Sequence, residues 1–279
     1  MKIGLVLPGG GARGAYQVGA WKAMAEVGIA SEISVISGVS VGAINAALFT
    51  AKDAEKATEL WGDLNFFNIM EINSEKIANH IVDILYEHKS FKKKIASLFT
   101  DEGYISRKRL ANMMDKYLDY EKIAHSKKRV YIACTNVSGV PNGEVLLSTI
   151  GIPVGEVEYM MLNDKNREEI KNVLLASSSI PFVFDKTRIN NNHYYDGGIS
   201  EAIPIGPVYD SGCDLIYVIG LNKKQRIEEN HYPGAKIVNI TLDENYKSVI
   251  PPSLNFSPEL IRKRIKRGYK DAIRILKKK

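Results

Sequence analysis

Two strand–turn–helix units, one directly after the other near the N-terminus, constrain the fold most. Residues 2–7 form a short apolar run typical of a buried strand, and residues 15–27 have apolar side chains at helical spacing, with Gly28 placed to end the helix. Residues 33–37 predict a second strand, and residues 41–51 predict an Ala-rich apolar helix. A glycine-containing turn joins strand to helix in both units. Units of this kind predict an α/β fold.

The rest of the chain continues the alternation of strands and helices. Residues 54–128 are mostly helical in pattern and contain many Lys and aromatic residues, so we expect a helical insert that forms a cap over a site. The length of 279 residues, 45% of them hydrophobic, is enough for one core, and we expect a single domain over residues 1–279. The sheet should be largely parallel. Further strand-like runs occur at residues 129–134, 145–148, 215–219 and 236–241.

Charge and cysteine content constrain the partners and the compartment. Residues 262–279 contain ten Lys or Arg and one Asp, a charge of +9, so the remaining residues sum to −3 of the total +6. Any attraction to an anionic surface therefore comes from this end. Cys134 and Cys213 fit neither a disulfide framework nor a C-x-x-C metal site. The first apolar run is too short for a signal peptide and no stretch resembles a membrane span, so we expect a cytoplasmic protein.

The first glycine turn has the spacing of an anion-binding loop. Gly9, Gly11 and Gly14 match G-x-G-x-x-G, but a dinucleotide site also needs an acid near the end of the second strand, and the nearest acid, Glu32, lies at its beginning. Backbone N–H groups of such a loop suit the oxyanion of an ester-hydrolysis intermediate instead, and Arg13 would add positive potential. The predicted oxyanion hole consists of Gly9, Gly10, Gly11, Ala12, Arg13 and Gly14.

The second glycine turn has the pattern G-x-S-x-G between an apolar strand and an apolar helix. In a nucleophile elbow, glycines on both sides of the serine avoid clashes in a sharp turn, and the serine hydroxyl is presented at a helix N-terminus. The alternative is an ordinary helix N-cap serine flanked by turn glycines. The predicted elbow consists of Gly38, Val39, Ser40, Val41 and Gly42.

A base for this serine is not obvious among the histidines. None of the five lies in a convincing late loop motif, and His231 lies in a polar loop where a solvated side chain is expected. Asp196, followed by Gly197 and Gly198, is either a turn former or a carboxylate placed against the serine, which can then take the serine proton directly. The histidines are His80, His88, His125, His193 and His231.

These motifs together resemble the patatin-like phospholipase family. The glycine loop at 9–14, the elbow at 38–42 and the Asp-Gly-Gly at 196–198 occur in the family's order, and the A-S-x-x-x-P block at 176–181 lies between serine and aspartate. The resemblance extends from residue 2 to about residue 221, and the G-Y-x-D-A at 268–272 is similar to the family's last helix. One departure is Glu201 after the Asp-Gly-Gly, where many relatives carry Asn before a Pro.

The resemblance implies a three-layer α/β/α fold and a Ser–Asp dyad that hydrolyses acyl esters of lipids without a metal or other cofactor. On this chain Ser40 would be the nucleophile and Asp196 the general base. The alternative is a non-catalytic lipid- or membrane-binding domain, and a dinucleotide oxidoreductase is disfavoured. A binding module has no need for the serine, the aspartate and the glycine loop together, which favours the hydrolase.

A basic helix is expected at about residues 257–279. Its apolar residues fall at helical spacing with Lys and Arg around them. Two interpretations stay open: a terminal helix packed on the domain by its apolar stripe, or a basic amphipathic helix in peripheral contact with an anionic membrane. Nucleic acid is a weaker candidate partner, because the basic residues lack interleaved aromatics apart from Tyr269.

Overall fold

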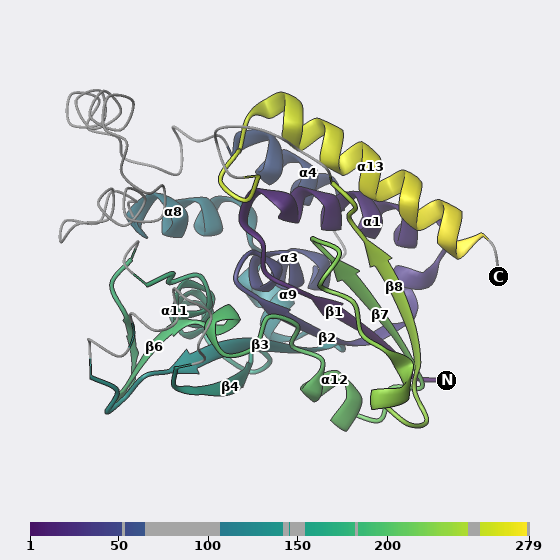
Figure 1. The fold of residues 1–279 in the computed structure, drawn as a ribbon. Coiled ribbons are helices and arrows are strands. Elements are labelled where there is room, and N and C mark those ends of the chain that lie inside the picture. The colour runs from purple at the N-terminus through teal and green to yellow at the C-terminus, as the bar shows by residue number, and fades with distance from the viewer. Residues whose placement is uncertain are drawn as a thin grey trace, which may run out of the picture.

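A mixed sheet of eight strands forms the centre of the molecule (Figure 1). The structure is a computed structural model that describes residues 1–51, 54–64, 107–141, 145, 154–181, 184–244 and 252–277. The strand order is β5-β6-β3-β2-β1-β7-β8, and β4 pairs with β3. The strands are β1 (Ile3–Leu7), β2 (Ile33–Val39), β3 (Arg129–Asn136), β4 (Glu156–Met161), β5 (Thr187–Ile189), β6 (Asn192–Asp196), β7 (Leu215–Gly220) and β8 (Lys236–Thr241).

The five central strands are parallel, which confirms the predicted fold class. Strand β1 pairs in parallel with β2 and β7, β2 pairs with β3, and β7 pairs with β8. These five strands were all predicted, because β1 and β7 in particular are continuous buried apolar runs. Strands β4, β5 and β6 are antiparallel and were not predicted. Of the strand predicted at residues 145–148 only Val145 is described, and it is helical.

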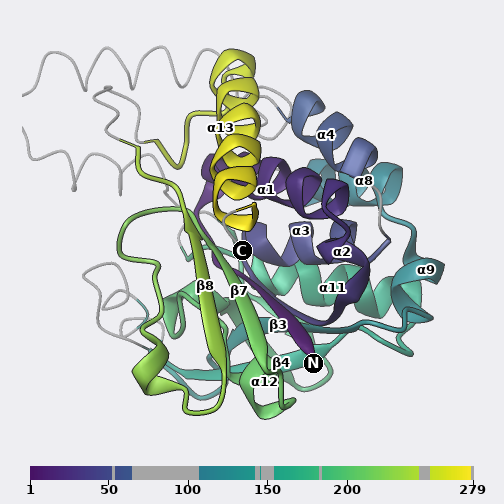
Figure 2. The same ribbon diagram turned by 90° about the vertical axis from the view of Figure 1, so that its right-hand side faces the viewer.

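Helices cover the two faces of the sheet unequally (Figure 2). One face carries most of the described helices and the larger hydrophobic core. The other face carries α12 (Gly206–Asp210) over a smaller core built around Val6, Val208 and Val218. The helices on the larger core are α1 (Ala15–Glu26), α2 (Ile29–Glu32), α3 (Val41–Thr50), α4 (Ala54–Asp63), α8 (Arg107–Tyr117), α9 (Tyr120–Ala124), α11 (Arg167–Ser177) and α13 (Pro258–Leu276).

Helix α13 packs along α1 at very short range. A Cβ atom on Gly19 would lie 1.9 Å from the Ile265 carbonyl oxygen, and one on Gly268 would lie 2.0 Å from the Tyr16 carbonyl oxygen, so glycine on each helix permits this approach. The Tyr16 hydroxyl also donates to Asp271 across the interface at 3.2 Å. The apolar stripe of the predicted basic helix is therefore buried on the domain.

The predicted insert at 54–128 is described only at its two ends. Helix α4 joins the core, because Trp61 is buried and its indole N–H donates to Asn45 of α3 at 2.9 Å. Residues 65–106 lie outside the described residues, so the expected cap over the site stays a prediction. Among the described helices, none is both long and apolar enough to cross a bilayer.

Candidate active site

The turn between β2 and α3 has the geometry of a nucleophile elbow. Ser40 has φ 57° and ψ −127°, a left-handed backbone conformation that non-glycine residues adopt rarely. A Cβ atom on Gly38 would lie 2.4 Å from the Gly42 carbonyl oxygen, and one on Gly42 would lie 2.0 Å from the Leu7 carbonyl oxygen. Glycine at both positions lets the chain turn this sharply, and Ser40 then lies at the N-terminus of α3.

The end of α11 holds this turn in place. The Ser40 backbone N–H donates to the Ser177 hydroxyl at 2.9 Å, and that hydroxyl donates to the Ala133 carbonyl of β3 at 2.8 Å. Ser177 belongs to the A-S-x-x-x-P block singled out in the sequence. Its side chain therefore ties the elbow to the central sheet.

Pairing with β3 brings Asp196 next to Ser40. Strand β2 pairs with the first part of β3 and ends with Val39 opposite Ala133, while β6 pairs antiparallel with the last part and ends with Asp196 opposite Cys134. Because β4 occupies the other edge of β3 along both parts, β2 and β6 share one edge and meet end to end. The Ser40 side chain interacts with the Asp196 carboxylate, and both line one pocket.

Asp196 is buried, with 6% of its surface exposed. Its Oδ1 accepts the Gly198 N–H at 2.8 Å, and its own backbone is anchored by Ser179 and Thr135 at 2.8 and 2.9 Å. Burial raises the pKa of Asp196 to about 6, although its hydrogen bonds with Ser40 and Gly198 act in the opposite direction. The carboxylate is thus ionised at neutral pH with a basicity suited to proton transfer.

The glycine loop faces the same pocket, and its six predicted residues are not equivalent. Gly9, Gly10 and Gly11 line the pocket. The Ala12 N–H donates to Ser253 at 2.8 Å, and the Arg13 guanidinium lies 3.8 Å from Glu244, which compensates its charge. Neither side chain lines this pocket, and neither does Gly14.

The loop offers two free backbone donors beside Ser40. The N–H groups of Gly10 and Gly11 form no hydrogen bond with another described residue. Gly9 lies directly against the nucleophile candidate, since a Cβ atom there would be 2.9 Å from the Ser40 Cβ. Two N–H groups without a described partner, in the same pocket as a serine hydroxyl, could stabilise an oxyanion there.

The pocket around these groups has a volume of about 420 Å³ and a largely apolar wall. None of the described histidines, at 125, 193 and 231, lines it. The described residues contain no group of three or more His, Cys, Asp or Glu side chains able to hold a metal ion. The lining residues are Gly9, Gly10, Gly11, Ser40, Ile180, Pro181, Asp196, Gly198, Ile199, Ala202, Gln225, Ser253 and Leu254.

Gln225 is a site residue that no sequence motif indicated. Its side chain donates to the Gly9 carbonyl at 2.8 Å and accepts the Leu221 N–H at 2.7 Å, and 8% of its surface is exposed. It therefore holds the start of the glycine loop against the end of β7. It lies in a polar loop of ordinary composition, so no pattern in the sequence marks it.

Two buried amides support the loop from behind. Gln17 donates to the Pro8 carbonyl at 2.9 Å, and Asn45 donates to the Gly14 carbonyl at 3.1 Å and to the Gln17 side chain at 2.8 Å. A signal for both was present in the sequence, because each is a polar residue with apolar or glycine neighbours within a mostly apolar helix.

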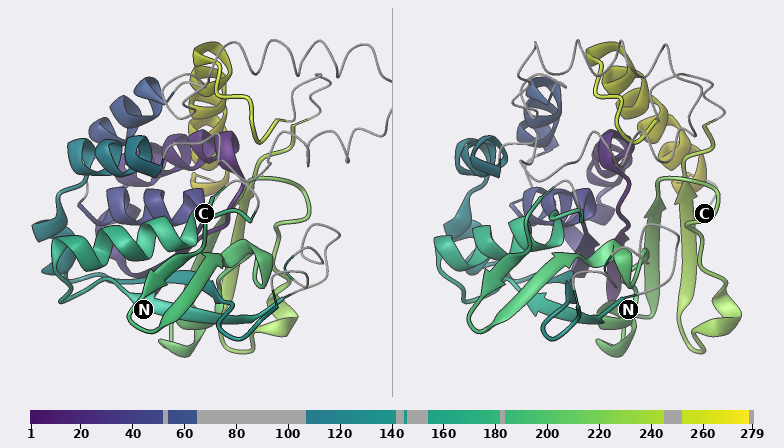
Figure 3. Two further views of the ribbon diagram at one scale, coloured as in Figure 1. Left: turned by 90° about the vertical axis from the view of Figure 1, so that its left-hand side faces the viewer. Right: turned by 60° about the vertical axis from the view of Figure 1, so that its left-hand side comes forward.

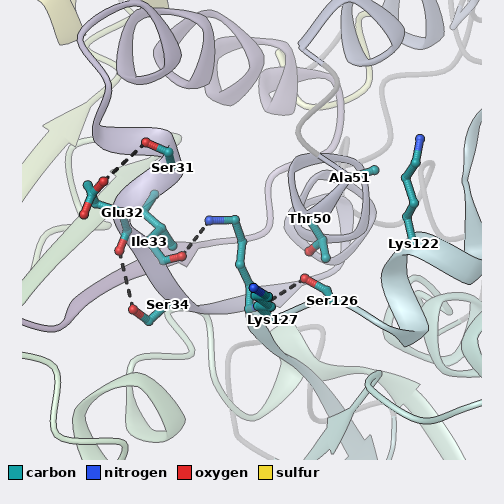
Figure 4. Close-up of a pocket in the computed structure, with 10 residues that line it drawn as sticks. Ser31, Glu32, Ile33, Ser34, Thr50, Ala51, Lys122, Ser126 and Lys127 are labelled. Carbon is teal, nitrogen blue, oxygen red and sulfur yellow. Dashed lines mark hydrogen bonds between the residues drawn. The ribbon is translucent and has the colours of Figure 1, made fainter.

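A second pocket lies at the opposite end of β2 (Figure 4). It has a volume of about 630 Å³ and is bounded by the start of β2, the end of α3 and the segment before β3. The ammonium group of Lys128, 5% exposed, donates to the carbonyls of Ala30 and Ile33 at 2.9 and 2.6 Å. Ser31, also in this pocket, has its hydroxyl 3.5 Å from a Glu32 carboxylate oxygen.

Comparisons with known proteins give the family and the fold. A model of the patatin-like phospholipase family matches residues 5–209, more than half of the chain. VipD from Legionella pneumophila has a similar fold, with 16% identity and a TM-score of 0.54 over 99% of this chain and 67% of that chain. A human GIVD cytosolic phospholipase A2 in complex with methyl gamma-linolenyl fluorophosphonate has 9% identity and a TM-score of 0.50 over 98% and 57%.

The curated relatives match over short stretches. Lysophospholipase nte1 of Aspergillus terreus is 57% identical over 53 residues, which are 19% of this chain and 3% of that protein. Patatin-like phospholipase domain-containing protein 7 of Mus musculus is 45% identical over 58 residues, which are 21% of this chain and 4% of that protein. The matched stretches are thus a small part of both relatives.

Proposed function

Because this chain belongs to the patatin-like phospholipase family, we propose that it hydrolyses carboxylic esters of lipids through Ser40 and Asp196. One observation carries the proposal: Ser40 and the buried carboxylate of Asp196 line one pocket, together with Gly10 and Gly11, whose N–H groups form no hydrogen bond with another described residue. A nucleophile, a base and an oxyanion site in one place are the parts that acyl transfer requires.

The mechanism has two halves. In the first, Asp196 accepts the Ser40 proton while the serine oxygen attacks the ester carbonyl, and the N–H groups of Gly10 and Gly11 bind the oxyanion. The intermediate collapses, and the alcohol leaves with the proton from Asp196. In the second half, water gives a proton to Asp196 and attacks the acyl-serine. Collapse of this intermediate releases the acid, and the proton returns to the Ser40 oxygen.

The pocket wall supports a lipid ester as the substrate class. Ile180, Pro181, Ile199 and Leu254 provide an apolar surface next to Ser40, which suits an acyl chain better than a polar acyl group. The names of the short sequence matches point to the same class, since several are called lysophospholipase.

Labelling with a fluorophosphonate probe tests the proposal directly, because the probe forms a covalent bond with an activated serine. We expect the wild type to be labelled and Ser40→Ala to remain unlabelled. Ser31→Ala is the matched control, since Ser31 also lies beside a carboxylate in a pocket, and it should be labelled like the wild type. A folded wild type that takes no label would favour the non-catalytic lipid-binding alternative.

A further inference from the structure

Helix α13 presents a continuous basic face to solvent. It lies along the outside of the molecule beside α1 (Figure 2). Its apolar side chains pack on the larger core. From residue 262 to residue 277 every exposed side chain is Lys or Arg. These residues are Arg262, Lys263, Lys266, Arg267, Lys270, Arg274 and Lys277.

Three of the described acidic residues near this face are already paired, and Glu259, in the first turn of α13, is exposed and forms no ion pair with a described residue. Asp271 forms ion pairs with Arg267 and Arg274, Glu244 pairs with the buried Arg264, and Asp243 pairs with Lys223. The other five basic side chains of the face form no ion pair with any described residue. Three of them, Lys263, Lys266 and Lys270, line a groove between α13 and the end of β8. Their charge is therefore available to an external anion.

The basic face starts next to the mouth of the active-site pocket. Ser253 and Leu254 line the pocket, and α13 begins at Pro258, so at 1.5 Å per residue Lys266 lies about 12 Å along the helix from its start. Arg264 links α13 to the segment that lines the pocket, because it donates to the Pro252 and Asn255 carbonyls at 2.9 and 3.2 Å.

The pocket mouth itself has an exposed apolar rim. Ile180 and Leu254 are 42% and 37% exposed and both line the pocket. In the part of the chain that the structure describes, the only other large hydrophobic residues this exposed are Met1 and Met161. An apolar rim beside a basic helix matches the layering of a lipid surface, in which anionic headgroups lie above acyl chains.

We propose that the basic face of α13, together with the rim formed by Ile180 and Leu254, docks on a membrane surface that carries anionic phospholipid headgroups. The proposal rests on the proposed function, because it names the surface from which the Ser40 pocket would take its substrate. Since the apolar stripe of α13 is buried on α1, the helix binds through charge at the level of the headgroups and does not insert its apolar side. Nucleic acid fits less well, because Tyr269, the one aromatic residue of the helix, is half-buried and bonded to Glu26.

Vesicle co-sedimentation tests the surface with the full chain carrying Ser40→Ala, so that the lipid stays intact. We expect binding to phosphatidylcholine vesicles with about 30% phosphatidylglycerol, little binding to pure phosphatidylcholine, and loss of binding at high salt. Lys263→Gln, Lys266→Gln and Lys270→Gln combined should weaken binding at least about tenfold. A matched triple change of exposed lysines on other elements should alter it less than about twofold. This control is Lys108→Gln, Lys127→Gln and Lys236→Gln.

Hydrolysis of a short monomeric p-nitrophenyl ester separates this proposal from the proposed function. For this assay the two triple changes are made in the chain that keeps Ser40. Both triple variants should hydrolyse the short ester as fast as the wild type, which also shows that they fold. Equal binding to neutral and anionic vesicles, an unaffected α13 triple variant, or tighter binding to a DNA duplex than to anionic vesicles at the same salt would each overturn the membrane proposal. If the wild type does not hydrolyse the ester but the Ser40→Ala chain still binds anionic vesicles, the result would count against the proposed function and not against the membrane proposal.

Discussion

The two ends of strand β2 each have a serine hydroxyl near a carboxylate, in pockets of comparable size. At the carboxyl end, Ser40 and Asp196 line a pocket of about 420 Å³, and at the amino end, the Ser31 hydroxyl lies 3.5 Å from a Glu32 carboxylate oxygen in a pocket of about 630 Å³. The difference lies in their surroundings. Asp196 is buried, whereas Ser31 and Glu32 are both exposed.

Backbone geometry favours the smaller pocket as the reactive one. The Ser31 hydroxyl donates to the Gly28 carbonyl at 2.6 Å, and the groups around it include no glycine loop with free N–H groups. Ser40 instead lies in a strained turn against the glycine loop. Figure 3 shows the whole fold from two further directions. Pocket volume is therefore a poorer guide to catalysis here than burial of the base and the presence of oxyanion donors.

The largest expected difference between the two ends is in ester hydrolysis. Ser40→Ala should lower kcat/KM by more than about 10³-fold because the nucleophile is lost, and Asp196→Asn should lower it by about 10²- to 10⁴-fold because the base is lost. Ser31→Ala and Glu32→Gln should leave it unchanged. Steady-state kinetics with a p-nitrophenyl ester measures all four. Comparable losses of kcat/KM for the variants at both ends of β2 would contradict the assignment of catalysis to the Ser40 end.

The elbow should also be far less tolerant of added volume than an ordinary helix. Gly42→Ala places a methyl group against the Leu7 carbonyl and should lower the free energy of unfolding by about 3 kcal/mol or more, a Tm decrease of roughly 5–10 °C. Gly62→Ala is the control, because no described atom outside its own helix backbone and chain neighbours lies within 4 Å of its Cβ position, and helix propensity predicts a small gain. Thermal unfolding of both variants checks this, and similar Tm values would contradict it.

Gln225, which holds the glycine loop in place, should affect turnover more than substrate binding. Gln225→Leu leaves the Gly9 carbonyl and the Leu221 N–H without their partner, so the loop donors shift and kcat should fall about 10- to 100-fold with a smaller change in KM. Lys224→Ala, an exposed neighbour, should have no effect. A Gln225→Leu enzyme with lower Tm but normal kcat would show that this side chain is purely structural.

The pH dependence of kcat/KM should reflect the burial of Asp196, the proposed base. Burial disfavours the charged carboxylate and raises the pKa of Asp196 to about 6, so the form able to accept the Ser40 proton is lost as pH falls through that value. We expect kcat/KM to fall about tenfold for each pH unit below about 6. A profile that stays flat to pH 4.5 would mean that the carboxylate behaves like an exposed one.

Local patterns accounted for much of the fold. Periodicity and turn chemistry placed β1, β2, α1 and α3 close to their observed bounds, because each is a continuous apolar or helical pattern with a glycine turn at one or both ends. Helix α13 was also predicted near its observed range. The antiparallel strands were not, since β4 is only partly buried and β5 and β6 are short, so their pairing depends on β3 and not on their own pattern.

The sequence by itself determined the nucleophile turn, the glycine loop and their order, because each is a local motif of strand, glycine and helix. Only the tertiary structure decided which group meets Ser40. Asp196 reaches it because β2 and β6 end at adjacent positions along one edge of β3, a register set by long-range pairing. Burial in the assembled core then raises the Asp196 pKa, and Gln225 reaches Gly9 only because β7 packs beside β1.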